Sequence, residues 1–166
     1  MVSQFVKDLN QNIGIVHRVC NLYFRYDNDE REDAFQEIMY QLWKSYPDFQ
    51  RESKFSTWMY RVALNTAITH VRKSKRAPET EKITRASDLV AESSEPMDRE
   101  ERMNFLYAAI NALSPVDKAI ILLHLEEKSY DEVAAITGLT KTNVSVRLVR
   151  IKKVLEERLK HTLLTN

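Results

Sequence analysis

Apolar residues recur every three or four positions along most of the chain, the spacing that gives an α-helix one buried face. The first such stretch covers about residues 2–26 and predicts one long helix, or two helices joined near Gly14. The next covers about residues 31–46, and a third covers about residues 56–73, with Ser56 or Thr57 as its N-cap. These patterns predict a bundle of helices in the first half of the chain.

The pattern dissolves between residues 77 and 101, where Ser, Glu and two prolines replace large apolar residues. This segment is predicted to be a flexible linker, with a short helix in its middle. Helical spacing returns at residues 103–113, and Ser114 then caps an almost wholly apolar helix. We therefore predict an all-α protein made of two small helical domains, residues 1–76 and 102–163, with 77–101 between them.

The segment from Ser129 to Lys153 has the pattern of a helix-turn-helix. Ser129 and Glu132 form a capping box at the start of a short helix, and Gly138 supplies the left-handed residue at the turn. Thr140 caps the next helix, which has a stripe for burial against the first. The stripe contains Val144, Leu148, Ile151 and Leu155.

The opposite face of that second helix combines hydroxyls, small apolar groups and cations, a mixture suited to base edges, thymine methyls and phosphates in a major groove. Its members are Lys141, Thr142, Ser145, Val146, Val149, Arg150 and Lys153. A plain helical bundle with a basic surface is the simpler alternative. The agreement of turn, spacing and face composition favours DNA binding.

Two further polar faces lie on the predicted helices of the first domain. The 31–46 helix has an acidic and amide face that is either solvated or docks a basic partner helix; it contains Asp33, Gln36, Glu37, Tyr40 and Gln41. The 56–73 helix has a face of cations, an amide and hydroxyls that is typical of a nucleic-acid surface; it contains Arg61, Asn65, Thr69, Arg72 and Lys73. At its head, Trp58 either stacks on an unpaired base or belongs to the core, and burial is the commoner state of a large aromatic.

Composition narrows the class of protein further. Two glycines and four prolines in 166 residues are few for a sheet protein, and the net charge of +1 hides separate acidic and basic clusters. Cys20 has no second cysteine to pair with, which favours a reducing compartment. Without a signal peptide or a long apolar run, we expect a soluble cytoplasmic protein that does not insert into a membrane.

The chemistry of catalysis has little support in the sequence. The four histidines pair with no carboxylate or cysteine at metal-ligand spacing, and there is no glycine-rich phosphate loop. We therefore expect no catalytic residue, no metal and no cofactor. A nucleic-acid enzyme would require an acidic metal cluster that the sequence does not show.

The whole pattern resembles bacterial sigma factors of the extracytoplasmic-function type, the minimal class that keeps only regions two and four. In the first domain the resemblance rests on REDAFQEIMYQLWKSYPDF (31–49) and FSTWMYRVALNTAITHVRK (55–73). In the second it rests on ALSPVDKAIILLHLEEKSYDEVAAITGLTKTNVSVRLVRIKKVLEE (112–157). The combination of these segments is much more specific than the helix-turn-helix alone.

The resemblance implies a promoter-specificity subunit with three surfaces. The acidic face of the 31–46 helix would bind core RNA polymerase, and the basic face of the 56–73 helix, headed by Trp58, would meet the minus-ten promoter element. The loop before that helix would capture an extruded base; it contains Asp48, Phe49, Gln50, Arg51, Glu52, Ser53 and Lys54. The helix-turn-helix would bind the minus-thirty-five element, and an anti-sigma factor would be the inhibitory partner.

Two departures from the family pattern concern the DNA-reading residues. The family often shows Arg then Gly where this chain has Gln50 and Arg51, which leaves the loop shape open. The recognition helix also lacks the family's commoner Gly-Thr and Lys-Ser pairs, whereas Arg147 and Arg150 match. A stand-alone helix-turn-helix regulator with a sensing or dimerising N-terminal domain is the alternative function.

Overall fold

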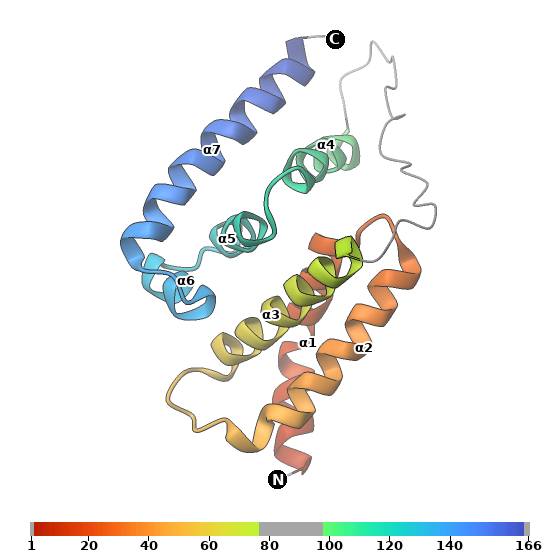
Figure 1. The fold of residues 1–166 in the computed structure, drawn as a ribbon, viewed down its shortest axis with the longest axis vertical. Helices are drawn as coiled ribbons and strands as arrows, with labels where there is room; N and C mark the ends of the chain where they lie inside the picture. The colour runs from red at the N-terminus through yellow and green to blue at the C-terminus, as the bar shows by residue number, and fades with distance from the viewer. Residues whose placement is uncertain (1, 77–97, 165–166) are drawn as a thin grey trace.

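The computed structural model describes residues 2–76 and 98–164. Within those ranges all regular secondary structure is helical. In chain order these are α1 (Val2–Phe24), α2 (Asn28–Ser45), the short 3-10 helix η1 (Tyr46–Asp48), α3 (Phe55–Arg76), α4 (Arg99–Asn111), α5 (Pro115–Leu125), α6 (Tyr130–Thr137) and α7 (Lys141–Leu164). Figure 1 shows α1 to α3 gathered in one group and α4 to α7 in another. The predicted all-α class is confirmed.

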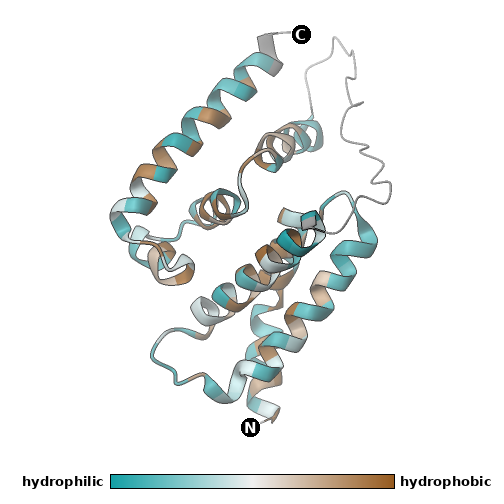
Figure 2. Ribbon diagram, viewed as in Figure 1, coloured by the Kyte–Doolittle hydropathy of each residue, from teal (hydrophilic) through white to brown (hydrophobic). Residues whose placement is uncertain are grey.

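Helices α1, α2 and α3 form an N-terminal bundle around a closely packed apolar core. Its fully buried side chains come from all three helices and include Val16, Val19, Ile38, Leu42, Met59 and Ala63. Helix α1 continues through Gly14, which decides between the one-helix and two-helix alternatives. The polar faces of α2 and α3 are consequently left on the outside of the bundle, as Figure 2 shows by the teal stretches of both helices.

Helices α4 to α7 form a C-terminal bundle in which α5 is the central element. Ser114 caps α5 by accepting a hydrogen bond from the Asp117 backbone N–H at 3.2 Å. Along α5, Ile120 and Leu123 are fully buried, and Val144 from α7 is buried with them. This packing fixes the helix-turn-helix on a rigid apolar support.

Three helix starts come earlier than those predicted, by one to four residues. Helix α2 begins at Asn28 because Asp27 accepts a hydrogen bond from the Glu30 N–H, and α4 begins at Arg99 because Asp98 caps it in the same way. Helix α3 begins at Phe55, before the caps predicted at positions 56 and 57. The rest of the predicted linker, including its short helix, lies outside the described residues.

A few large apolar residues on these helices are exposed. Trp43 is 51% exposed because it stands at the margin of the α2 stripe, where one edge of its ring meets Phe5 at a centroid distance of 5.4 Å. Met103 and Leu125 are also exposed, each near an end of its helix. Helical spacing therefore predicts which side of each helix is buried, but it does not show how far burial extends around and along the helix.

The helix-turn-helix has the local chemistry that the sequence predicts. The capping box between Ser129 and Glu132 is complete, and its hydrogen bonds lower the pKa of the Glu132 carboxyl. Gly138 has a φ of 77°, and its N–H donates to the Ala134 carbonyl. Thr140 accepts a hydrogen bond from the Asn143 N–H at 3.1 Å and so caps α7. Helix α6 is thereby held directly against α7.

Replacing Gly138 with alanine is expected to lower the free energy of unfolding by about 1 kcal/mol, because a Cβ disfavours the left-handed conformation. No atom within 4 Å of the added methyl would contribute a clash, so the cost is confined to the backbone. Gly14→Ala within α1 is the comparison: helix propensity favours alanine there by up to about 1 kcal/mol, and the added Cβ, 2.9 Å from Nη1 of Arg18, displaces that flexible side chain and offsets part of the gain. Urea denaturation of both variants checks this, and equal effects of the two changes would contradict it.

The two bundles lie directly against each other. Helix α3 contacts α5 and α6, and α1 contacts α4 and α5. Their buried apolar residues form one continuous cluster. The helix-turn-helix is therefore packed beside the polar face of α3.

Candidate nucleic-acid interface

Helix α7 turns the predicted recognition face away from the core. Its stripe of Val144, Leu148, Ile151 and Leu155 is buried against the bundle. On the other side, Val146 is 43% exposed and Val149 is 66% exposed. Lys141, Thr142, Arg150 and Lys153 are exposed as well, and Ser145 is half-buried. Most of the predicted residues thus form one outward surface.

Arg147 is placed differently from the rest of that set. Its guanidinium Nη1 lies 3.0 Å from Oδ1 of Asp117 in the first turn of α5, and its side chain is partly buried. Arg147 is half-buried, whereas Arg150 is exposed on the outward side of α7. The ion pair fastens the recognition helix to α5 and engages the charge of Arg147 within the chain.

The polar face of α3 is exposed in the structure, but one of its members is already engaged. Arg61, Asn65, Thr69, Arg72 and Lys73 are all exposed. Arg61 donates through Nε to the Ala135 carbonyl of α6 at 3.2 Å, and its Nη2 donates to the same oxygen. The first residue of the face predicted to meet DNA, Arg61, is therefore bound to α6 of the C-terminal bundle.

Trp58 is half-buried in an aromatic cluster at the head of α3. Its ring centroid lies 5.0 Å from Phe49, 5.4 Å from Phe55 and 6.2 Å from Tyr46. This packing favours the core interpretation of Trp58 over a free stacking ring. It also makes Phe49 an anchor for the loop that follows it.

The loop between η1 and α3 keeps most of its polar residues at the surface. Asp48, Gln50, Arg51, Glu52, Ser53 and Lys54 are exposed, and Phe49 is half-buried. Arg51 has a φ of 58°, in the left-handed region that glycine adopts without strain. The family resemblance places a glycine at this position, where this chain has an arginine in a left-handed conformation.

The acidic face of α2 is also at the surface. Asp33, Gln36, Glu37 and Tyr40 are exposed, and the half-buried Gln41 donates from Nε2 to Glu37 Oε1 at 3.0 Å. Beside them, Tyr40 and Trp43 are each more than half exposed. Trp43 lies at the margin of the apolar stripe of α2, and this marginal position is the signal for a surface role.

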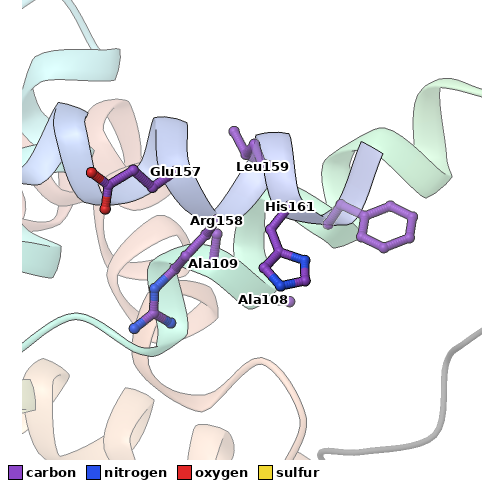
Figure 3. Close-up of a pocket in the computed structure, with 7 residues that line it drawn as sticks. Ala108, Ala109, Glu157, Arg158, Leu159 and His161 are labelled. Atoms are coloured by element: carbon purple, nitrogen blue, oxygen red, sulfur yellow. The ribbon is translucent and has the colours of Figure 1, made fainter. Parts of the chain in front are cut away.

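One hollow of about 450 Å³ lies between α4 and α7. Figure 3 shows His161 beside Ala108, with Arg158 and Glu157 nearer the start of α7. Across residues 2–76 and 98–164, no group of three or more His, Cys, Asp or Glu side chains could hold a metal ion. Cys20 is buried, and burial raises the pKa of its thiol to about 11, so it stays protonated and unreactive at neutral pH. In the same ranges, each helix is too short or too polar to cross a membrane.

An outward basic helix-turn-helix joined to a helical bundle with a cationic face defines a two-part DNA-binding protein. Comparison with known families specifies the class: the Sigma-70 region 2 family matches residues 9–77, and the Sigma-70, region 4 family matches residues 106–155. The chain belongs to the sigma-70 family of RNA polymerase sigma factors, and to its extracytoplasmic-function type. It binds core RNA polymerase, directs it to specific promoters and assists promoter melting. The alternative of a stand-alone regulator is not favoured.

Curated relatives agree with this assignment. The chain is 27% identical over 155 residues to the ECF RNA polymerase sigma-E factor of Haemophilus influenzae. The alignment covers 86% of this chain and 82% of the relative. It is 28% identical over the same length to the sigma-E factor of Escherichia coli K12, with 86% and 81% covered.

Solved structures show the same fold at lower identity. The sigma factor RpoE of Bartonella quintana, crystallised with the anti-sigma factor NepR, aligns with a TM-score of 0.71 and 21% identity over 95% of this chain and 97% of that one. CnrH, solved in complex with the cytosolic domain of CnrY, aligns with a TM-score of 0.68 and 17% identity over 97% and 90%.

Proposed function

We propose that the chain divides the work of a sigma factor among three surfaces. The exposed acidic face of α2 binds core polymerase, and the loop before α3 together with the polar face of α3 binds the minus-ten element. The outward face of α7 binds the minus-thirty-five element. Domain limits of 1–76 and 102–163, with residues 77–101 between them, give each promoter element its own domain.

The observation that carries this proposal is the burial pattern of α7. One side of the helix is buried without a polar interruption, and the other presents Val149, Arg150 and Lys153 together. A recognition helix needs a rigid support on one side and an accessible polar face on the other. The chain itself is proposed not to be a catalyst, because sigma factors, the family to which it belongs, are non-enzymatic transcription initiation factors.

Free protein is expected to bind a promoter duplex weakly and with strong salt dependence, because each surface contributes only a few phosphate contacts. Core polymerase would fix the separation of the two domains and convert two weak contacts into one specific complex. Fluorescence anisotropy of a labelled promoter fragment, with and without core polymerase, tests this. Tight promoter binding by the free protein would overturn the proposed dependence.

An anti-sigma factor is the proposed inhibitory partner. The two structural neighbours were each solved in complex with another protein, NepR, an anti-sigma factor, in one case and the cytosolic domain of CnrY in the other. Sigma factors act on the polymerase in the cytoplasm, so such a partner must present its binding region there. The exposed faces of α2 and α7 are the surfaces from which it would exclude polymerase and DNA.

Arg150→Ala and Arg147→Ala are expected to weaken binding to the upstream element for different reasons. Loss of a phosphate contact at Arg150 should lower the slope of log affinity against log salt by about 0.9. Arg147→Ala should leave that slope unchanged, because its partner is Asp117. Salt titrations of promoter binding in the presence of core polymerase measure both slopes. A lowered slope for Arg147→Ala would show that this residue contacts phosphate as well.

A further inference from the structure

A free carboxamide group lies at the start of the recognition helix. Helix α7 begins beside α6 (Figure 1), and Asn143 is exposed in its first turn. The backbone N–H of Asn143 donates to the hydroxyl of Thr140, the cap of the helix. At the same position of α6, Glu132 reaches back and accepts from the Ser129 N–H at 2.9 Å. The Asn143 carboxamide makes no such contact and has no hydrogen-bonding partner among the described residues.

The direction in which Asn143 projects follows from the buried stripe of α7. At about 100° per residue, the position of that stripe places the middle of the outward face at Val146 and Lys153. Asn143 lies about 70° from this middle, and Arg150 lies about 50° from it on the same side. Ser145 lies about 90° away and is half-buried. Asn143 therefore belongs to the outward face more fully than Ser145 does.

The backbone that carries Asn143 is held in place on both sides. The next residue, Val144, is fully buried, and one turn further Arg147 forms its ion pair with Asp117 of α5 at 3.0 Å. Recognition of a base edge by two hydrogen bonds requires a side chain on a rigid support. The first turn of α7 provides such a support.

The other polar side chains of the outward face differ from Asn143 in hydrogen-bonding chemistry. Arg150 and Lys153 donate hydrogen bonds but cannot accept them. The Thr142 hydroxyl donates and accepts through one atom, a contact that suits either kind of base edge. A carboxamide donates from its nitrogen and accepts at its oxygen, and this pair of groups matches N7 and the N6 amino group of adenine. Residues at the N-terminal end of a recognition helix are also those that reach base edges.

We infer that Asn143 is a specificity-determining residue of α7 and that it recognises an adenine of the minus-thirty-five element in the major groove. Its Nδ2 donates to N7 of the adenine, and its Oδ1 accepts from the N6 amino group. Arg150, seven residues or about 10 Å further along the helix axis, contacts phosphate and does not select a base. This inference rests on the proposed assignment of the outward face of α7 to that element.

Asn143→Asp separates recognition of a base from a structural role in the helix. The two side chains have nearly the same shape, and a carboxylate is favourable in the first turn of a helix, so α7 should remain folded. Aspartate cannot donate to N7 of adenine, but it accepts from the N4 amino group of cytosine. The affinity ratio between adenine and cytosine at one position should therefore fall by roughly tenfold. A general loss of affinity from the added charge cancels in this ratio.

The measurement is binding of the assembled holoenzyme to a promoter that it transcribes, with each base pair of the upstream element replaced in turn. Asn143→Ala should remove the base preference at one position only. Arg150→Ala should instead weaken binding to all templates about equally, because a phosphate contact carries no sequence information. Asn10→Ala makes the same change at an exposed position of α1 and is the matched control, so its preferences should equal those of the wild type.

The inference is overturned if both Asn143 variants keep the wild-type preferences, weaken binding to every template equally, or alter a G·C pair. Circular dichroism confirms that each variant is folded, and Asn143→Asp replaces Asn143→Ala if the latter unfolds. A failure of the proposed surface is distinguishable, because wild-type holoenzyme would then bind equally well whichever base pair of the upstream element is replaced. That result would overturn the assignment of α7 together with the inference.

Discussion

Glu37→Arg is expected to weaken binding to core RNA polymerase by about 100-fold and to abolish transcription at protein concentrations that suffice for the wild type. The carboxylate is exposed at the centre of the α2 face and is oriented by Gln41. Reversing a charge at the centre of a charged interface removes an attraction and adds a repulsion of several kcal/mol. Surface plasmon resonance with immobilised core polymerase measures the change.

Glu32→Arg is the matched control for Glu37→Arg. It makes the same charge change at another exposed position of the same helix, outside the five-residue face. Its polymerase affinity should stay within about threefold of the wild type, as expected for a change at the rim of an interface. If Glu37→Arg binds as tightly as Glu32→Arg, the polymerase is bound by another surface.

Val149→Glu is expected to lower affinity for the upstream promoter element by at least about tenfold and to leave polymerase binding unchanged. Val149 is 66% exposed, so the substitution has little effect on the core. A carboxylate placed there would face phosphates that the neighbouring cations are proposed to bind. The measurement is promoter binding by the assembled holoenzyme on templates with and without the upstream element.

Val154→Glu tests whether the position on α7 matters. Val154 is 36% exposed on the same helix, about 140° around the axis from Val149 and one turn beyond Arg150. Because it lies at the edge of the outward face, the control should lose clearly less affinity than Val149→Glu. Equal losses in the two variants would mean that added negative charge on α7, and not the outward face, determines the effect.

The parts of the fold that depend on neighbouring residues could be predicted from the sequence. The capping box of Ser129 and Glu132 and the turn at Gly138 are each determined within a few residues, because backbone hydrogen bonds at helix ends are local. The buried stripe of α7 also followed from spacing alone. These features place the helix-turn-helix and its outward face.

Contacts between distant parts of the chain could not be predicted in this way. Arg61 and Ala135 are 74 residues apart, and nothing in helical spacing indicates that a cation on α3 meets a carbonyl on α6. Arg147 likewise belongs to the basic pattern of α7, and only packing brings it to Asp117. For both residues, an exposed-cation interpretation from sequence omitted a partner inside the protein.

The burial of residues at the edge of an apolar stripe could not be predicted from the sequence either. Trp43 has the spacing of a core residue, but the core of the N-terminal bundle is already filled by Ile38 and Leu42 from the same helix. The indole is left at the surface beside Tyr40, where it extends the α2 face. An exposed aromatic pair next to carboxylates has the composition of an interface centre.

In vitro transcription with purified core RNA polymerase, with and without this protein, tests the central claim most directly. The templates are a promoter set that contains candidate minus-ten and minus-thirty-five elements at the usual separation. We expect discrete, promoter-specific transcripts that require the protein and disappear with Glu37→Arg. Transcripts that are the same with and without the protein on every template would contradict it.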